Sequence, residues 1–143
     1  MFEDFVAASL TDALKSIDSH AVAQDSQRID EAGIVRMNPD LVWYRGNHAA
    51  AVIDAKYKTE KPSGYPNADL YQLLAYCTAL GLDEGHLVYA QGAGDPAVHI
   101  VREAGVRLVA HAVDLDQLPD QLIKQMVAIA GRVAAGVELQ VQS

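Results

Sequence analysis

The chain has 143 residues, enough for one domain with a hydrophobic core, so we expect residues 1–143 to form a single domain. Half of the residues are hydrophobic and 21% are charged, a balance typical of globular proteins and not of disordered or membrane chains. No apolar run is long enough to span a bilayer, and Met1 is not followed by a secretory signal, which predicts a cytoplasmic protein. Cys77 is the only cysteine and excludes both an internal disulfide and a cysteine-based zinc cluster.

The net charge of -8 argues against nucleic acid as a partner, because nucleic-acid-binding domains usually carry a basic surface. This average hides a local difference. The segment 36–61 contains five arginines and lysines and three acidic residues, Asp40, Asp54 and Glu60. A cationic surface around this segment is therefore compatible with the overall charge.

Periodicity predicts the following elements in chain order. Apolar residues at helical spacing indicate a helix over 2–17. The polar segment 19–36 holds one short strand near 21–24, and two strands at 41–44 and 49–56 form an antiparallel hairpin. A loop over 58–67 leads into a helix over 68–80, with its apolar face inward. Strands follow at 86–90, 97–102 and 106–113, and a last helix over 118–135 is expected to stop at Gly136.

Side-chain alternation places Asp54 and Lys56 on one face of their strand and Ile53 and Ala55 on the other. Asp40 opens the neighbouring strand, where the hairpin would bring its carboxylate toward that of Asp54. Two carboxylates suit Mg²⁺, which keeps water and phosphate oxygens as its other ligands, and the backbone carbonyl of Ala55 could add one more oxygen. Such a cation polarises a phosphodiester and acidifies a bound water, while Lys56 would orient that water and stabilise the transition state.

Polar residues of two predicted helices are expected near the surface that carries Asp54 and Lys56. Glu3 flanks the apolar stripe of the first helix and could complete the metal shell. In the second helix, Asp69, Gln72 and Tyr76 form a polar stripe, from which Gln72 and Tyr76 could reach a phosphate or hold Lys56. Asp69 itself is interpreted as a first-turn helix acid.

The order Asn38-Pro39-Asp40, Asp54-Ala55-Lys56 and Gln72 to Tyr76 resembles the PD, DxK and QxxxY motifs of the RecB-like branch of PD-(D/E)xK nucleases. More narrowly, the segments 2–6, 53–58 and 69–76 resemble the nuclease domain of the McrC family, the cleavage subunit of the 5-methylcytosine-specific McrBC restriction system. The resemblance runs from Phe2 to about Tyr89.

This resemblance implies a Mg²⁺-dependent DNA endonuclease, in which Mn²⁺ can substitute. It assigns Asp40 and Asp54 as metal ligands, Glu3 as the helical acid, Lys56 as catalytic, and Gln72 and Tyr76 as supporting residues. It also implies an McrB-like AAA+ GTPase as partner, although McrC-like chains contact that motor through an N-terminal region and this sequence starts at the nuclease helix. Because a single site cuts one strand, cleavage of both strands would require a homodimer or two loaded complexes.

Other interpretations remain open. A nuclease-like DNA-binding or assembly subunit without activity agrees with the acidic charge. Tyr57, Lys58 and Lys61 are expected to be solvated. The five histidines show no metal-binding spacing, which disfavours a zinc site, and Cys77 is expected in the core.

The predicted fold is α/β, a restriction-endonuclease-like PD-(D/E)xK core with a mixed sheet flanked by the first, second and last helices. The site is expected at the sheet edge beneath the first and second helices.

Overall fold

The computed structural model describes residues 2–15, 19–57, 67–90 and 96–142. The predicted loop over 58–67, with Lys58 and Lys61, lies almost wholly outside these residues. The helices and strands are, in chain order, α1 (Phe2–Leu14), β1 (Ser19–Ala23), β2 (Gln27–Arg28), β3 (Arg36–Met37), β4 (Leu41–Arg45), β5 (His48–Lys56), α2 (Asn67–Leu80), β6 (Glu84–Tyr89), β7 (Ala97–Ile100), β8 (Arg107–Ala112) and α3 (Pro119–Gln142).

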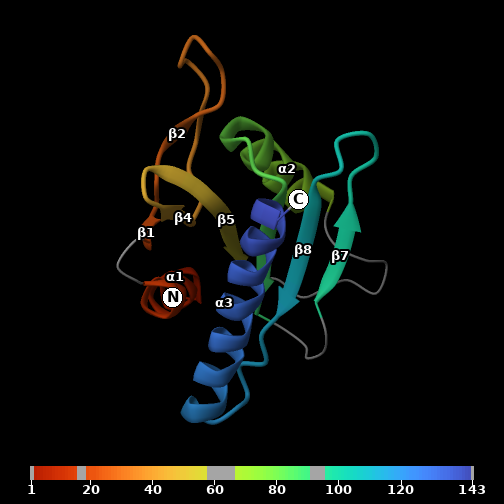
Figure 1. The fold of residues 1–143 in the computed structure, drawn as a ribbon. Helices are drawn as coiled ribbons and strands as arrows, with labels where there is room; N and C mark the ends of the chain where they lie inside the picture. The colour runs from red at the N-terminus through yellow and green to blue at the C-terminus, as the bar shows by residue number, and fades with distance from the viewer. Residues whose placement is uncertain (1, 16–18, 58–66, 91–95, 143) are drawn as a thin grey trace.

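Six strands form one mixed sheet in the order β1-β4-β5-β6-β8-β7 (Figure 1). The pairs β1/β4, β4/β5 and β7/β8 are antiparallel, which confirms the predicted hairpin of β4 and β5. The pairs β5/β6 and β6/β8 are parallel. The three parallel strands therefore have their carboxyl ends at the same end of the sheet.

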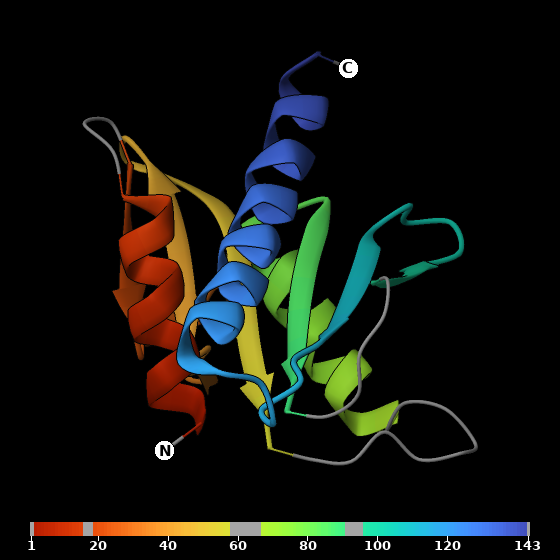
Figure 2. The ribbon, with the colours of Figure 1, turned by 90° about the horizontal axis from the view of Figure 1, so that it is seen from below.

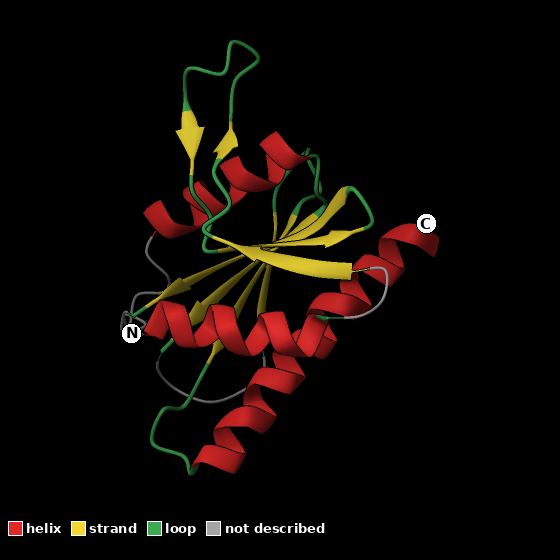
Figure 3. Cartoon of the chain, turned by 90° about the vertical axis from the view of Figure 1, so that its left-hand side faces the viewer, coloured by secondary structure: helices red, strands yellow, loops and turns green. Residues whose placement is uncertain are grey.

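The helices cover both faces of the sheet, as Figure 3 shows, with α1 and α3 on one side and α2 on the other. Figure 2 views the molecule from the side of α1 and α3 and shows the two helices crossing the sheet, with α2 behind it. Side-chain alternation along β5 divides the core: Val52 packs on the α2 side, and Ile53 and Ala55 pack on the α1 and α3 side. The α/β fold and the three flanking helices are confirmed. None of the helices within the described ranges is both long and apolar enough to cross a membrane.

Four details of the prediction are wrong. The first helix ends at Leu14 and not at residue 17. The small hairpin of β2 and β3, which projects from the body of the molecule (Figure 1), is absent from the prediction. Both of these strands have only two residues, too few to show an alternating pattern. The expected site is also not at the sheet edge, because β4 and β5 lie inside the sheet and the edges are β1 and β7.

The last error concerns Gly136, which does not end the final helix, since α3 continues to Gln142. Instead this glycine lets α3 approach the sheet: a Cβ at this position would lie 2.2 Å from Glu84 Oε1. The Glu84 carboxylate is buried and held by Arg132 and Arg107, so it cannot move aside at little cost. Gly136 is therefore a close-contact residue and not a helix stop.

This contact predicts opposite effects of two matched substitutions in α3. Gly131→Ala should stabilise the protein by up to about 1 kcal/mol, because alanine favours helix and the position is open. Gly136→Ala should lower the free energy of unfolding in spite of the same helix preference. Urea denaturation of the two variants measures both effects, and equal stabilisation would contradict the close contact.

Candidate active site

Asp40 and Asp54 lie opposite each other where β4 begins, because the hairpin pairs Leu41 with Ile53. The backbone N–H of Asp40 donates to Asp54 Oδ1 at 3.0 Å, and the backbone N–H of Ala55 donates to Asp40 Oδ2 at 2.8 Å. Each carboxylate is thus held by a backbone amide of the other strand. The predicted convergence of the two acids on one surface is present.

Lys56 joins this pair from the same face of β5. Its Nζ lies 2.9 Å from Asp54 Oδ2 and donates a hydrogen bond of 2.9 Å to Gln72 Oε1 on α2. The predicted contact between Gln72 and Lys56 is therefore present. Asp54 is almost fully buried, whereas the Lys56 side chain is 22% exposed, so solvent reaches the ammonium group but hardly the Asp54 carboxylate.

The charges in this cluster influence one another. The pKa of Asp54 is raised, chiefly because burial penalises the charged carboxylate and also because Asp40 repels it, although the Lys56 hydrogen bond acts in the other direction. Burial lowers the pKa of Lys56, but the hydrogen bond and charge of Asp54 and the charges of Asp69 and Asp40 outweigh it and raise the pKa overall. Lys56 is consequently cationic at neutral pH.

Tyr76 is a buried neighbour of the two acids. Its ring packs in the core beneath α2, and burial together with the charges of Asp54 and Asp40 raises its pKa to about 12. The hydroxyl therefore stays protonated and can donate a hydrogen bond. Of Gln72 and Tyr76 in the predicted polar stripe, Gln72 is exposed and Tyr76 is buried.

Asp69 lies in the first turn of α2, as predicted, but it is buried and accepts a hydrogen bond of 3.3 Å from the Tyr89 hydroxyl on β6. Its charge raises the pKa of Lys56, so Asp69 belongs to the electrostatic surroundings of the site. Cys77 is in the core, as expected.

Glu3 lies in the first turn of α1, on the other face of the sheet from α2. The ring of Phe2 contacts the ring of Tyr57, with centroids 6.0 Å apart, so this end of α1 lies beside the end of β5. In the part of the chain that the structure describes, no three His, Cys, Asp or Glu side chains are grouped to hold a metal. The assignments of Glu3 and of the Ala55 carbonyl as ligands remain predictions.

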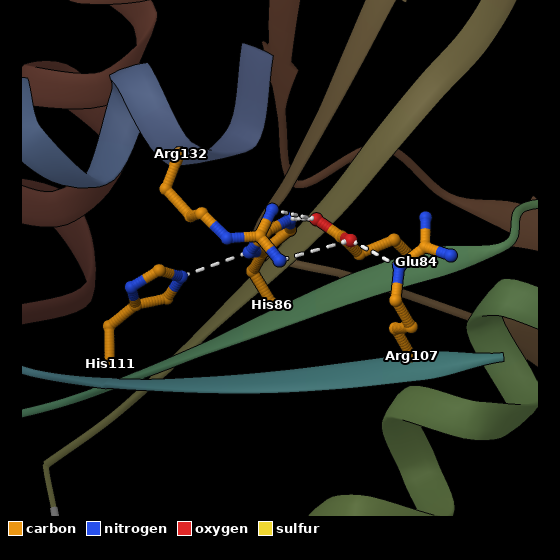
Figure 4. Close-up of polar contacts among 5 residues, drawn as sticks. All are labelled: Glu84, His86, Arg107, His111 and Arg132. Atoms are coloured by element: carbon orange, nitrogen blue, oxygen red, sulfur yellow. Dashed lines mark hydrogen bonds and ion pairs between the residues drawn. The ribbon is translucent and has the colours of Figure 1, made fainter. Parts of the chain in front are cut away.

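A second polar cluster, which the sequence did not reveal, lies on the opposite face of the sheet (Figure 4). The buried carboxylate of Glu84 on β6 accepts hydrogen bonds from Arg107 Nε at 2.8 Å and Arg132 Nη1 at 2.7 Å, and lies 3.1 Å from His86 Nε2. Nδ1 of His86 in turn lies 2.9 Å from Nε2 of His111. The two histidines are 25 residues apart and meet because β6 and β8 are neighbours, which no spacing rule could have predicted.

Burial determines which members of this cluster are charged. It opposes the charge on Glu84, but hydrogen bonds from His86, Arg107 and Arg132 prevail and lower the pKa of Glu84 to about 2. Burial lowers the pKa of His111 to about 3, and it lowers that of His86 as well. At neutral pH the cluster thus contains an ionised carboxylate, two arginines and two neutral imidazoles.

A family model described as McrBC 5-methylcytosine restriction system component matches residues 1–90. The chain belongs to this family. Curated protein sequences gave no match.

A solved structure shares this fold. A chain in the refined half-complex from the tetradecameric assembly of Thermococcus gammatolerans McrB AAA+ hexamers with bound McrC is similar in fold, with a TM-score of 0.73 and 19% identity. The match covers 92% of this chain and 32% of that chain, so this protein spans about a third of the length of its structural relative. The solved structure thus shares the fold, and the family model shows an McrBC restriction system component.

The raised pKa of Asp54 predicts how the metal-free protein responds to Asp54→Asn. A carboxyl group with a raised pKa destabilises the folded state when it is ionised, and this cost disappears as pH falls through the folded pKa. In EDTA, Asp54→Asn should therefore raise Tm relative to wild type more at pH 7 than near pH 4. Thermal denaturation at both pH values tests this, with the exposed Asp12→Asn as control. A lower Tm for Asp54→Asn at pH 7 would show that its ion pair with Lys56 outweighs burial and repulsion.

The buried histidines predict acid sensitivity. Because the pKa of His111 is lowered to about 3, the unfolded chain takes up this proton near pH 6.5 and the folded protein does not. Stability should fall as pH drops from 6.5 toward 3, by up to about 1.4 kcal/mol per pH unit for this group. Urea denaturation as a function of pH should show a shallower decline for His111→Asn. An unchanged slope would mean that His111 is protonated in the folded state.

Proposed function

We propose that this McrC-like domain is a Mg²⁺-dependent DNA endonuclease that hydrolyses phosphodiester bonds, with Mn²⁺ as a substitute ion. The observation that carries the proposal is the convergence of Asp40, Asp54 and Lys56 on one face of the sheet, with both carboxylates fixed by backbone amides. Membership of a restriction-system family supports DNA as the substrate.

The donor set fits Mg²⁺. Asp40 and Asp54 provide carboxylate oxygens, the ligand type that Mg²⁺ prefers, and few protein ligands are needed because this ion keeps several waters. Asp40 repels Asp54, and this repulsion helps to raise the pKa of Asp54. A divalent cation bound by both acids would relieve it. When bound, the ion would polarise the phosphate and make a water more acidic.

The protein's own groups would do the remaining work. Asp40 and Asp54 cannot easily turn away, because the hydrogen bonds to their backbone amides fix both carboxylates. Lys56 supplies a positive charge near the scissile phosphate, where negative charge grows in the transition state. Gln72 holds the Lys56 ammonium group in place, and the protonated Tyr76 hydroxyl can donate to a phosphate oxygen.

Loss of DNA cleavage in single variants tests this assignment. Asp54→Ala and Lys56→Ala should each reduce Mg²⁺-dependent cleavage of plasmid DNA by at least about a hundredfold, and Gln72→Ala should reduce it less. Lys124→Ala, which removes an exposed lysine on α3, is the matched control and should cleave like wild type. Cleavage that survives both Asp54→Ala and Lys56→Ala would refute the catalytic assignment. An intact chain that neither cleaves DNA nor binds Mg²⁺ or Mn²⁺ would instead favour a DNA-binding or assembly subunit.

We also propose that the domain acts with an McrB-like AAA+ GTPase, as the McrC in the similar complex is bound to McrB hexamers. Addition of such a partner with GTP to the domain should then stimulate cleavage. A homodimer of the domain is the alternative for cutting both strands. Size-exclusion chromatography with light scattering, on the domain alone and with the partner, distinguishes these two assemblies.

A further inference from the structure

The buried His111, the hydrogen-bond partner of His86, lines a cavity of about 510 Å³ between β8 and α3. His111 and Arg132 belong to its lining, and so do side chains with no part in the proposed nuclease chemistry. The volume lies within the range of small-molecule sites, which is roughly 300–1,000 Å³.

The hydrogen-bond chain fixes the state of the His111 ring. Ionised Glu84 can only accept, so the Nε2 of neutral His86 carries the proton and its Nδ1 has a lone pair. His111 must then donate from Nε2, which leaves its own Nδ1 as an acceptor. This second nitrogen points away from His86 in Figure 4.

His111 is 3% exposed, and among the described residues its Nδ1 has no hydrogen-bond partner. A buried acceptor without a partner costs free energy, so a bound molecule that offers an N–H or O–H at this point is favoured. An anion is not favoured, because it would meet this lone pair and because the Asp114 carboxylate also belongs to the lining of the cavity.

The rest of the lining limits the ligand further. Pro96, Ala112, Ala128 and Ile129 provide apolar contact. The side-chain amide of Gln121 offers a donor and an acceptor, whereas the amide of Gln125 already bonds the backbone N–H and C=O of Asp114 and has only its second hydrogen and second lone pair left. A neutral molecule with an apolar body and with hydrogen-bond donors and acceptors along its edge, such as a nucleobase, is compatible with this lining.

The cavity also lies at the same end of the sheet as the candidate active site. In the sheet, Lys56 on β5 pairs with Tyr89 on β6, and Tyr89 pairs with Ala112 on β8. These three residues lie side by side across the strands, and Ala112 lines the cavity. Two strand spacings of about 4.8 Å separate the backbones of Lys56 and Ala112, so the cavity begins about 10 Å from the Lys56 backbone. It lies on the α3 side of the sheet, whereas the Lys56 side chain lies on the α2 side. In open parallel sheets, ligands bind beyond the carboxyl ends of the strands.

We propose that this cavity is a binding site for a nucleobase, which donates an N–H group to Nδ1 of His111. The site is separate from the metal-binding acids, and base binding needs neither Mg²⁺ nor cleavage. The proposal can thus hold even if the nuclease assignment fails.

NMR titration of the intact, metal-free chain with each of the four deoxynucleosides tests the proposal. At least one nucleoside should shift the signals of His111, Ala112 and Ile129, and Ala128→Trp should weaken its binding at least tenfold by filling the cavity without touching the histidines. Ile123→Trp, the same change at an exposed position on another side of α3, should leave binding unchanged.

His111→Phe should also abolish binding, with His48→Phe at an exposed position of the hairpin as its control. No shifts with any nucleoside, or shifts that persist unchanged in Ala128→Trp, would overturn the proposal. Equal shifts with ribose alone would overturn it too, since they would indicate a sugar site. Loss of DNA cleavage in Asp54→Ala with nucleoside binding retained would separate the two functions.

Discussion

The pairing of β4 with β5 is the constraint on which the candidate active site depends. The register that sets Leu41 against Ile53 also sets the carboxylate of each acid against a backbone N–H of the other strand. A shift by one residue would turn Asp54 and Lys56 toward α1 and α3 and bury them among apolar side chains. The burial of Ile53 and Ala55 in the core on that face favours the observed register. Core packing thus positions the polar site on the opposite face.

The Glu84 cluster has a comparable role for the other half of the molecule. One buried carboxylate joins β6 to β8 through Arg107 and to α3 through Arg132. Such a charge is tolerated in the interior only when its hydrogen bonds are satisfied, and here two guanidinium groups and an imidazole satisfy them. Gly136 provides the space that the carboxylate requires. The position of α3 over the sheet therefore rests on a polar contact as well as on the apolar residues of its inner face.

The parts of this structure that could be predicted are those specified by local patterns. The helices α1 and α2 and the β4/β5 hairpin follow from apolar periodicity, and alternation along one strand sufficed to place Asp54 and Lys56 on a common face. The pairing of His86 with His111 depends on which strands become neighbours in the parallel part of the sheet, and local sequence does not encode that choice. The role of Gly136 was misjudged for the same reason. A glycine after an apolar helical stripe usually ends a helix, and only the approach of Glu84 from another strand shows that this one does not.

The acidic net charge of -8 is easier to understand once the burial of the acids is known. Asp54, Asp69 and Glu84 are all buried, so a portion of the negative charge is not on the surface that a polyanion would meet. Glu84 is compensated by two arginines, and Asp54 is paired with Lys56. Two carboxylates together with one ammonium leave the candidate site with a net negative charge, which repels a phosphate. A divalent cation bound by the two acids would reverse that sign, so a phosphodiester would be attracted to the site only once the cation is in place.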